Sequence, residues 1–106
     1  MNIPSEVILD ETVSANTESK FFDLSKSNSF SLQIVAVGTL SGTLSIKGAN
    51  EQVDAYMTEL PSGSIALSGA SAVALYARAA EFDCAKVFYT HTSGTGTIRI
   101  VAKAKA

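Results

Sequence analysis

The sequence predicts an all-β protein, an antiparallel two-sheet β-sandwich of jelly-roll-like or immunoglobulin-like type with about seven or eight short strands. Two observations predict this class. Several segments alternate apolar and polar residues with a period of two, which is typical of half-buried strands. Short segments rich in Gly, Ser and Thr separate them and indicate turns. We expect residues 1–19 to form an N-terminal arm or edge strand and residues 20–106 to form the sandwich domain.

The strand that the alternation defines best spans residues 30–37. One of its faces is apolar and consists of Phe30, Leu32, Ile34 and Ala36. Before it, residues 7–9 are a short apolar run and residues 14–20 have the polar composition of a loop. After it, residues 38–42 supply glycines for a turn, and residues 43–47 alternate again. These two alternating segments predict a β-hairpin.

The middle of the chain is less regular. Residues 53–60 are a strand candidate, which we expect to end at 61–63 because proline removes a ladder donor and glycine permits a tight turn. Residues 65–67 predict a short strand. In residues 72–80 the alanines favour a helix, whereas the alternation of side chains favours a strand. We favour the strand.

The last third of the chain predicts a second hairpin. Residues 86–91 are rich in strand-forming side chains, residues 93–96 contain two glycines, and residues 97–105 alternate. The two hairpins are preceded by similar dipeptides, Phe22-Asp23 and Phe82-Asp83, so the chain contains a weak internal repeat. Two hairpins that each have one apolar face bury those faces against each other in a sandwich.

The hairpin segments resemble those of small bacteriophage structural proteins. The matching segments are Phe-Ser-Leu-Gln-Ile-Val from residue 30, the stretch 41–50, Ala-Lys-Val-Phe-Tyr-Thr-His from residue 85, and the Ser-Gly-Thr-Gly-Thr turn with its strand at 93–103. The resemblance implies a virion component with a β-sandwich, of the capsid decoration, fibre or tail-associated kind. The loop after Asn50 departs from the pattern, because Glu-Gln-Val stands there in place of Asp-Gly.

Few residues suit catalysis or metal binding. His91 is the single histidine, which excludes sites that need two histidines, including most zinc sites. Cys84 is the single cysteine, and we expect it to be a buried structural residue although Lys86 lies close to it. The carboxylates show no spacing that selects a catalytic pair or a calcium loop. We therefore predict no enzyme, no catalytic or metal residue and no cofactor.

Charge and apolar patterning limit the partners. A net charge of −2 without a basic cluster argues against nucleic-acid binding, and no apolar run is long enough to span a membrane. The first residues lack the pattern of a secretory signal. We therefore expect a chain made in the host cytoplasm and located in the virion.

Apolar residues on outward faces are the candidate interface. Val35, Val37 and Val101 face away from the expected core, so a second copy, a major capsid protein or another virion protein is expected to cover them. Asp23 and Asp83 occupy matching positions of the repeat, either as an intersubunit ion pair or as turn residues. The alternative function is a carbohydrate-binding module that attaches to a host or surface glycan through exposed aromatic rings.

Overall fold

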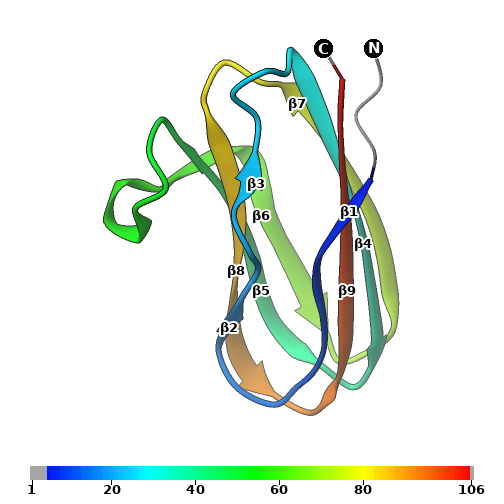
Figure 1. Cartoon of the computed structure of the whole chain (residues 1–106). Coiled ribbons are helices and arrows are strands. Elements are labelled where there is room, and N and C mark those ends of the chain that lie inside the picture. The colour runs from blue at the N-terminus through cyan, green and yellow to red at the C-terminus, as the bar shows by residue number, and fades with distance from the viewer. Residues whose placement is uncertain (1–4, 106) are drawn as a thin grey trace.

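The computed structural model describes residues 5–105 and confirms the all-β prediction, with two antiparallel sheets packed face to face (Figure 1). Sheet A has the strand order β1-β9-β4-β7, and sheet B has the order β2-β8-β5-β6. The strands of sheet A are β1 (Glu6–Val13), β9 (Gly96–Lys105), β4 (Ser29–Gly38) and β7 (Ala72–Ala79). Those of sheet B are β2 (Thr17–Glu18), β8 (Cys84–Ser93), β5 (Ser41–Ala49) and β6 (Thr58–Ser68), and the short β3 (Phe22–Asp23) also pairs with β8.

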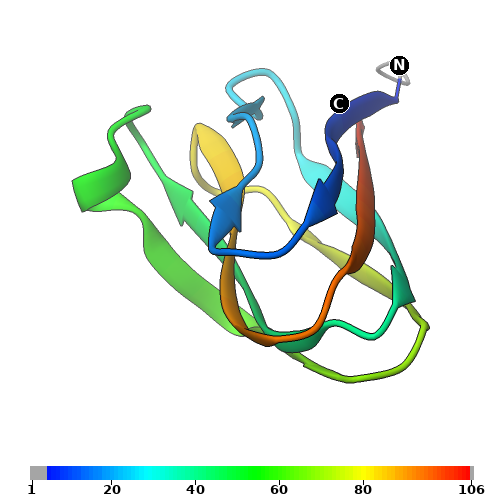
Figure 2. The same ribbon diagram turned by 90° about the horizontal axis from the view of Figure 1, so that it is seen from below.

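Six connections cross from one sheet to the other: β1 to β2, β3 to β4, β4 to β5, β6 to β7, β7 to β8, and β8 to β9. The connections β1 to β2, β4 to β5, β6 to β7 and β8 to β9 lie at the same end of the sandwich, as the view from below shows (Figure 2). The two predicted hairpins are therefore wrong, because β4 pairs with β7 and β9, whereas β5 pairs with β6 and β8. For the first of these hairpins the physical reason is Leu40, which is fully buried in the β4–β5 connection. A hairpin tip would leave that side chain in water, whereas a crossing between sheets places it in the core.

The internal repeat has a structural counterpart. The crossings β4–β5 and β8–β9 lie against each other, with β4 beside β9 and β5 beside β8. Their turns meet where the Thr39 N–H donates to the Thr95 carbonyl oxygen at 2.9 Å. Gly94 has a φ of +80°, and a Cβ at this position would overlap the Thr39 carbonyl oxygen. The close approach of the two turns therefore requires glycine.

The core follows the alternation that the sequence shows. Inward side chains of β4, β5, β8 and β9 are buried between the sheets, and the largest are Tyr89, Leu32, Ile34, Leu44, Ile46, Ile98 and Ile100. The open side between β7 and β6 is bridged by Tyr76, whose hydroxyl donates to the Pro61 carbonyl oxygen at 2.9 Å. The strand predicted at residues 72–80 is confirmed as β7.

The segment 53–68 differs from the prediction. Asp54–Tyr56 forms a short 3-10 helix, η1, so residues 53–60 are not one strand. β6 begins at Thr58 and continues past Pro61. Its pairing with β5 passes from Ser45↔Ser64 to Lys47↔Glu59, so the residues around Pro61 form a bulge. An edge strand accommodates proline in this way, since the missing donor is not needed for pairing. In addition, β2 lies within the segment 14–20 that was expected to be a loop.

No helix within residues 5–105 has the length and apolar character needed to cross a membrane.

Candidate interaction surface

The outer face of sheet A carries a group of neighbouring apolar side chains, with Gln33 among them, which we call the sheet A patch. Its position follows from the strand register: Val7 lies beside Val101, and Gln33 lies between Val101 and Leu75. In the next row Val35 lies beside Val73. With Val37 at the end of β4, the patch consists of Val7, Val35, Val37, Val73, Leu75 and Val101.

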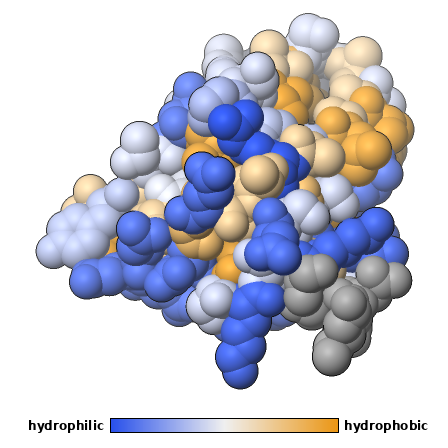
Figure 3. All heavy atoms as spheres, turned by 90° about the horizontal axis from the view of Figure 1, so that it is seen from above, coloured by the Kyte–Doolittle hydropathy of each residue, from blue (hydrophilic) through white to orange (hydrophobic). Residues whose placement is uncertain are grey.

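Several of these side chains are unusually exposed for apolar residues. The exposed fraction is 72% for Val73, 68% for Leu75 and 55% for Val37. In the space-filling view from above, hydrophobic residues gather towards the upper right, where sheet A lies (Figure 3). Exposed apolar side chains that gather on one face of a small domain indicate an interaction surface, whereas isolated exposed valines do not.

The structure places the predicted interface residues in two different regions. Val35, Val37 and Val101 lie together in the sheet A patch. Asp23 lies in β3 and Asp83 directly precedes β8, on the other sheet. The Asp23 carboxylate accepts a hydrogen bond from the Ser25 N–H at 3.0 Å, which also lowers the pKa of Asp23. This is the geometry of a turn-forming aspartate.

Sequence reasoning missed the members of the patch from other strands, Val7, Val73 and Leu75. For β7 a signal existed, because Tyr76 alternates with Leu75 and is the larger aromatic side chain. Tyr76 is buried, so Val73 and Leu75 have to face outward. For Val7 no comparable signal existed, because its strand has a bulge between Val7 and Leu9.

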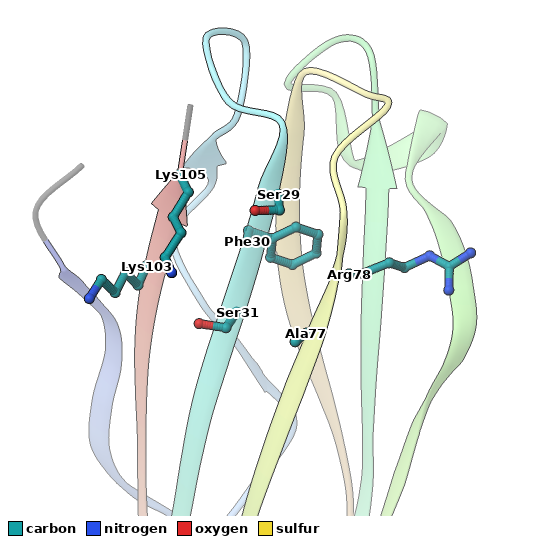
Figure 4. Close-up of a pocket in the computed structure, with 7 residues that line it drawn as sticks. All are labelled: Ser29, Phe30, Ser31, Ala77, Arg78, Lys103 and Lys105. Atoms are coloured by element: carbon teal, nitrogen blue, oxygen red, sulfur yellow. The ribbon is translucent and has the colours of Figure 1, made fainter. Parts of the chain in front are cut away.

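Charged residues border the sheet A patch on two sides. Arg99 of β9 lies beside Val35, and its Nε is 3.6 Å from the carboxylate of Asp10 in β1. Beyond the patch, Lys103 and Lys105 of β9 and Ser29 and Ser31 of β4 line an open depression of about 370 Å³ (Figure 4). Arg78, which also lines the depression, points away from the two lysines. The patch is thus a defined apolar area within a polar surface.

The outer face of sheet B is organised around Lys86. Its side chain is only 6% exposed, and its ammonium group donates to Glu18 and Asp54 at 2.8 Å each. The same ammonium group lies 4.5 Å from the ring centre of Phe21 and 5.1 Å from that of Phe88. Burial lowers the pKa of Lys86, but the two carboxylates outweigh this effect and the pKa is raised. Lys86 thereby fixes β2 and η1 on sheet B.

The loop that carries η1 projects from the sandwich (Figure 1). Met57 is buried against Cys84 beneath it, and the Cys84 thiol donates to the Ala49 carbonyl oxygen at 3.4 Å. Tyr56, at the end of η1, is 59% exposed. Buried contacts on one side and the ion pair of Asp54 with Lys86 on the other join this projection to sheet B.

Phe88 is the aromatic residue that best fits the alternative of a glycan site. It lines a depression of about 450 Å³ with Asn16 and Glu18. However, two ammonium groups lie over its ring, Lys86 as described and Lys47 at 4.8 Å from the ring centre. The Asn16 side chain accepts the His91 N–H at 2.7 Å. The groups that a sugar would need are therefore already engaged with the protein.

The chemically versatile side chains have structural surroundings. The Tyr89 hydroxyl lies 3.0 Å from His91 Nδ1 and donates to the Ser41 carbonyl oxygen at 3.1 Å. Within residues 5–105 no hydrogen bond joins the His91 ring to a serine or a carboxylate. Burial raises the pKa of the Cys84 thiol and that of the Tyr89 hydroxyl, which keeps both groups protonated. No cluster of three or more His, Cys, Asp or Glu side chains suited to a metal ion occurs in the part of the chain that the structure describes.

Comparison with solved structures identifies the fold but not a family. The SPBc2 prophage-derived protein YomS is similar with a TM-score of 0.65 and 12% sequence identity, covering 95% of this chain and 92% of that chain. The Tobacco streak virus coat protein dimer is similar with a TM-score of 0.41 and 12% identity, covering 100% of this chain and 84% of that chain. At such identity the likeness to YomS shows the fold alone, and the second similarity is too low to support an argument. No protein-family model and no curated protein matches the sequence.

Proposed function

We propose that this chain is a non-enzymatic structural protein of a virion, a capsid decoration or another particle-surface component that acts through contacts with copies of itself and with a shell protein. The observation that carries this proposal is the sheet A patch. Six apolar side chains from four strands lie together on a face that the sandwich does not need for its own core. A protein keeps such a surface in water when a partner covers it in the functional state.

The strand order supports the same proposal. A four-stranded and a five-stranded sheet, with the main orders β1-β9-β4-β7 and β2-β8-β5-β6 and six connections crossing between them, support a jelly-roll arrangement. Jelly rolls occur in viral capsid proteins and in lectins. A similar fold belongs to a prophage-derived protein, and the hairpin-like segments of the sequence resemble those of small bacteriophage structural proteins. Fold alone does not assign function, and the exposed patch supports the first of these uses.

The proposed mode of action is burial of apolar area. Full burial of a Val or Leu side chain contributes about 1.5–3 kcal/mol, and Val73, Leu75 and Val37 are mostly exposed. Three such residues contribute about 3–6 kcal/mol after allowance for the part already buried. The cost of associating two free molecules is about 4 kcal/mol or more. One patch therefore supports a weak contact in solution and a firm one in a repeated lattice.

The test is to purify particles from the host that encodes the chain and to measure its copy number by quantitative mass spectrometry. We expect the chain to sediment with the particles in a fixed ratio to the shell protein. The substitution Val73→Asp, on the exposed outer face, should leave the isolated chain folded and lower its occupancy on particles about tenfold or more. A chain that stays in the soluble fraction while particles are complete would contradict the proposal.

A further inference from the structure

We propose that β7 pairs edge to edge with β7 of a second copy, so that two sheets A join into one eight-stranded antiparallel sheet. This inference rests on the proposed function, because it names the contact through which subunits associate.

Among the edges of the two sheets, β7 is the least protected. β1 has a bulge after Val7, and its Ile8 carbonyl oxygen accepts the Lys20 N–H at 2.9 Å. β6 contains Pro61 within a bulge, and the strands β2 and β3 have two residues each. Bulges, proline, charge and short length are the usual means of preventing edge pairing. β7 has eight residues in unbroken register with β4, no proline, and Arg78 as its one charged residue.

The hydrogen-bond phase shows which backbone groups are directed outward. The Thr39 N–H donates to the Thr95 carbonyl oxygen. In the register of β4 with β9, the backbone N–H and C=O groups of odd-numbered β4 residues are therefore directed at β9, and those of even-numbered residues at β7. The bond from the Ala80 N–H to the Asn28 carbonyl oxygen agrees with this phase. The even-numbered residues of β7 therefore bond to β4. The N–H and C=O groups of its odd-numbered residues are directed at the open edge, and these residues are Val73, Leu75, Ala77 and Ala79.

The same residues present the exposed side chains. Val73 and Leu75 are the two most exposed large hydrophobic residues of the described chain. An antiparallel pair centred on Leu75 aligns Val73 with Ala77 of the second copy and brings the outward N–H and C=O groups of both strands into register. Each copy thus offers the donors, acceptors and apolar contacts that the other copy requires.

Charge is compatible with this arrangement. In the pairing centred on Leu75, Arg78 lies opposite Ala72 of the second copy. The two Arg78 side chains are then six residues apart along the strands, about 20 Å. That separation exceeds the screening length of about 8 Å at physiological ionic strength. A second copy is therefore a suitable occupant, and no like charges meet at the contact.

The area of the contact predicts its strength. A strand of eight residues is about 27 Å long, and the sheets lie about 10 Å apart. A strip of these dimensions is a few hundred square ångströms per copy, below the roughly 800 Å² per partner of a stable complex. We therefore expect a dimer with a dissociation constant of about 10 μM or weaker, which becomes effective when many copies are held on one particle.

The experiment is sedimentation equilibrium of the full chain from about 1 μM to about 1 mM. Wild type should dimerise with rising concentration, and Leu75→Lys should weaken the dimer by about tenfold or more, because lysine on an edge strand opposes pairing. Val37→Lys is the matched control, since Val37 is exposed on the same face but lies in β4, away from the edge. Circular dichroism checks that both variants are folded.

Hydrogen exchange followed by NMR gives a second readout. The amides of Val73, Leu75 and Ala77 should become protected as concentration rises, while the even-numbered amides of β7 are protected at all concentrations. A wild type that stays monomeric at about 1 mM, a Leu75→Lys variant that dimerises normally, or a Val37→Lys variant that is equally impaired would overturn the inference. A monomer that is still present on particles would refute the β7 contact alone, and a dimer that is absent from particles would refute the proposed function.

Discussion

The substitution Lys86→Met tests whether the buried ammonium group holds β2 and η1 on sheet B. Methionine retains most of the apolar stem, so the change removes the charge without opening a large cavity. It leaves Glu18 and Asp54 without the cation that lies 2.8 Å from each of them. The variant therefore isolates the electrostatic part of the contact.

The expected loss follows from the contacts. A hydrogen bond to a charged group contributes about 1.5–3 kcal/mol, and Lys86 makes two of them. The two carboxylates are about half exposed and regain water when the cation is removed, which reduces the loss. We expect the free energy of unfolding to fall by about 2 kcal/mol, which corresponds to about 10 °C in Tm for a domain of this size.

Urea unfolding followed by far-UV circular dichroism measures this loss, and Lys47→Met is the matched control. Lys47 lies over the same Phe88 ring, but no ion pair joins it to a carboxylate within residues 5–105. Its replacement should cost about 0.5 kcal/mol. Amide exchange should increase at residues 17–19 and 51–57 in Lys86→Met alone. Equal losses in the two variants, or unchanged exchange in these segments, would refute the reasoning.

Two further predictions concern the turn contact and pH. Gly94→Ala should destabilise the fold by about 3 kcal/mol, because the strain of a left-handed backbone adds to an overlap of the new Cβ with the Thr39 carbonyl oxygen. Gly69→Ala is the control and should cost about 1 kcal/mol in the same urea assay. Gly69 also has a positive φ, of +81°, but the nearest atom to its added Cβ is Ser41 Oγ at 3.3 Å. Equal losses would contradict the close contact of the turns. Stability should also fall as pH rises above about 9, because the pKa values of Cys84 and Lys86 are raised in the folded chain and the unfolded chain releases these protons first. An unfolding midpoint that stays constant between about pH 8 and pH 11 would exclude this linkage.

The strands and their faces were predictable from sequence because alternation is a local property. Val35, Val37 and Val101 were identified as outward-facing residues, and the structure places them on the outer face of sheet A. Pairing was not predictable in the same way, because a short glycine-containing turn fits both a hairpin and a crossing between sheets. Leu40 was the available signal, since an apolar side chain inside a turn indicates that the turn is buried.

Contacts between distant segments were beyond the sequence pattern. Lys86 lies in a strand that is strongly apolar, but its partners are 68 and 32 residues away in sequence. Nothing in the spacing of Glu18 or Asp54 indicates that they converge on one ammonium group. The strand predicted at residues 53–60 failed for a related reason, because the anchoring of Asp54 and Met57 favours a short 3-10 turn over continued pairing with β5.

The central position of β9 has a consequence for synthesis of the protein. β9 lies between β1 and β4, and Ser29 pairs with Lys105. A nascent polypeptide that has left the ribosome only as far as residue 95 therefore lacks a middle strand of sheet A, and its β1 has no neighbour. Such non-local pairing makes folding slow, and here it delays folding until translation has passed β9. During that interval the apolar faces of β4 and β1 are exposed and prone to aggregation.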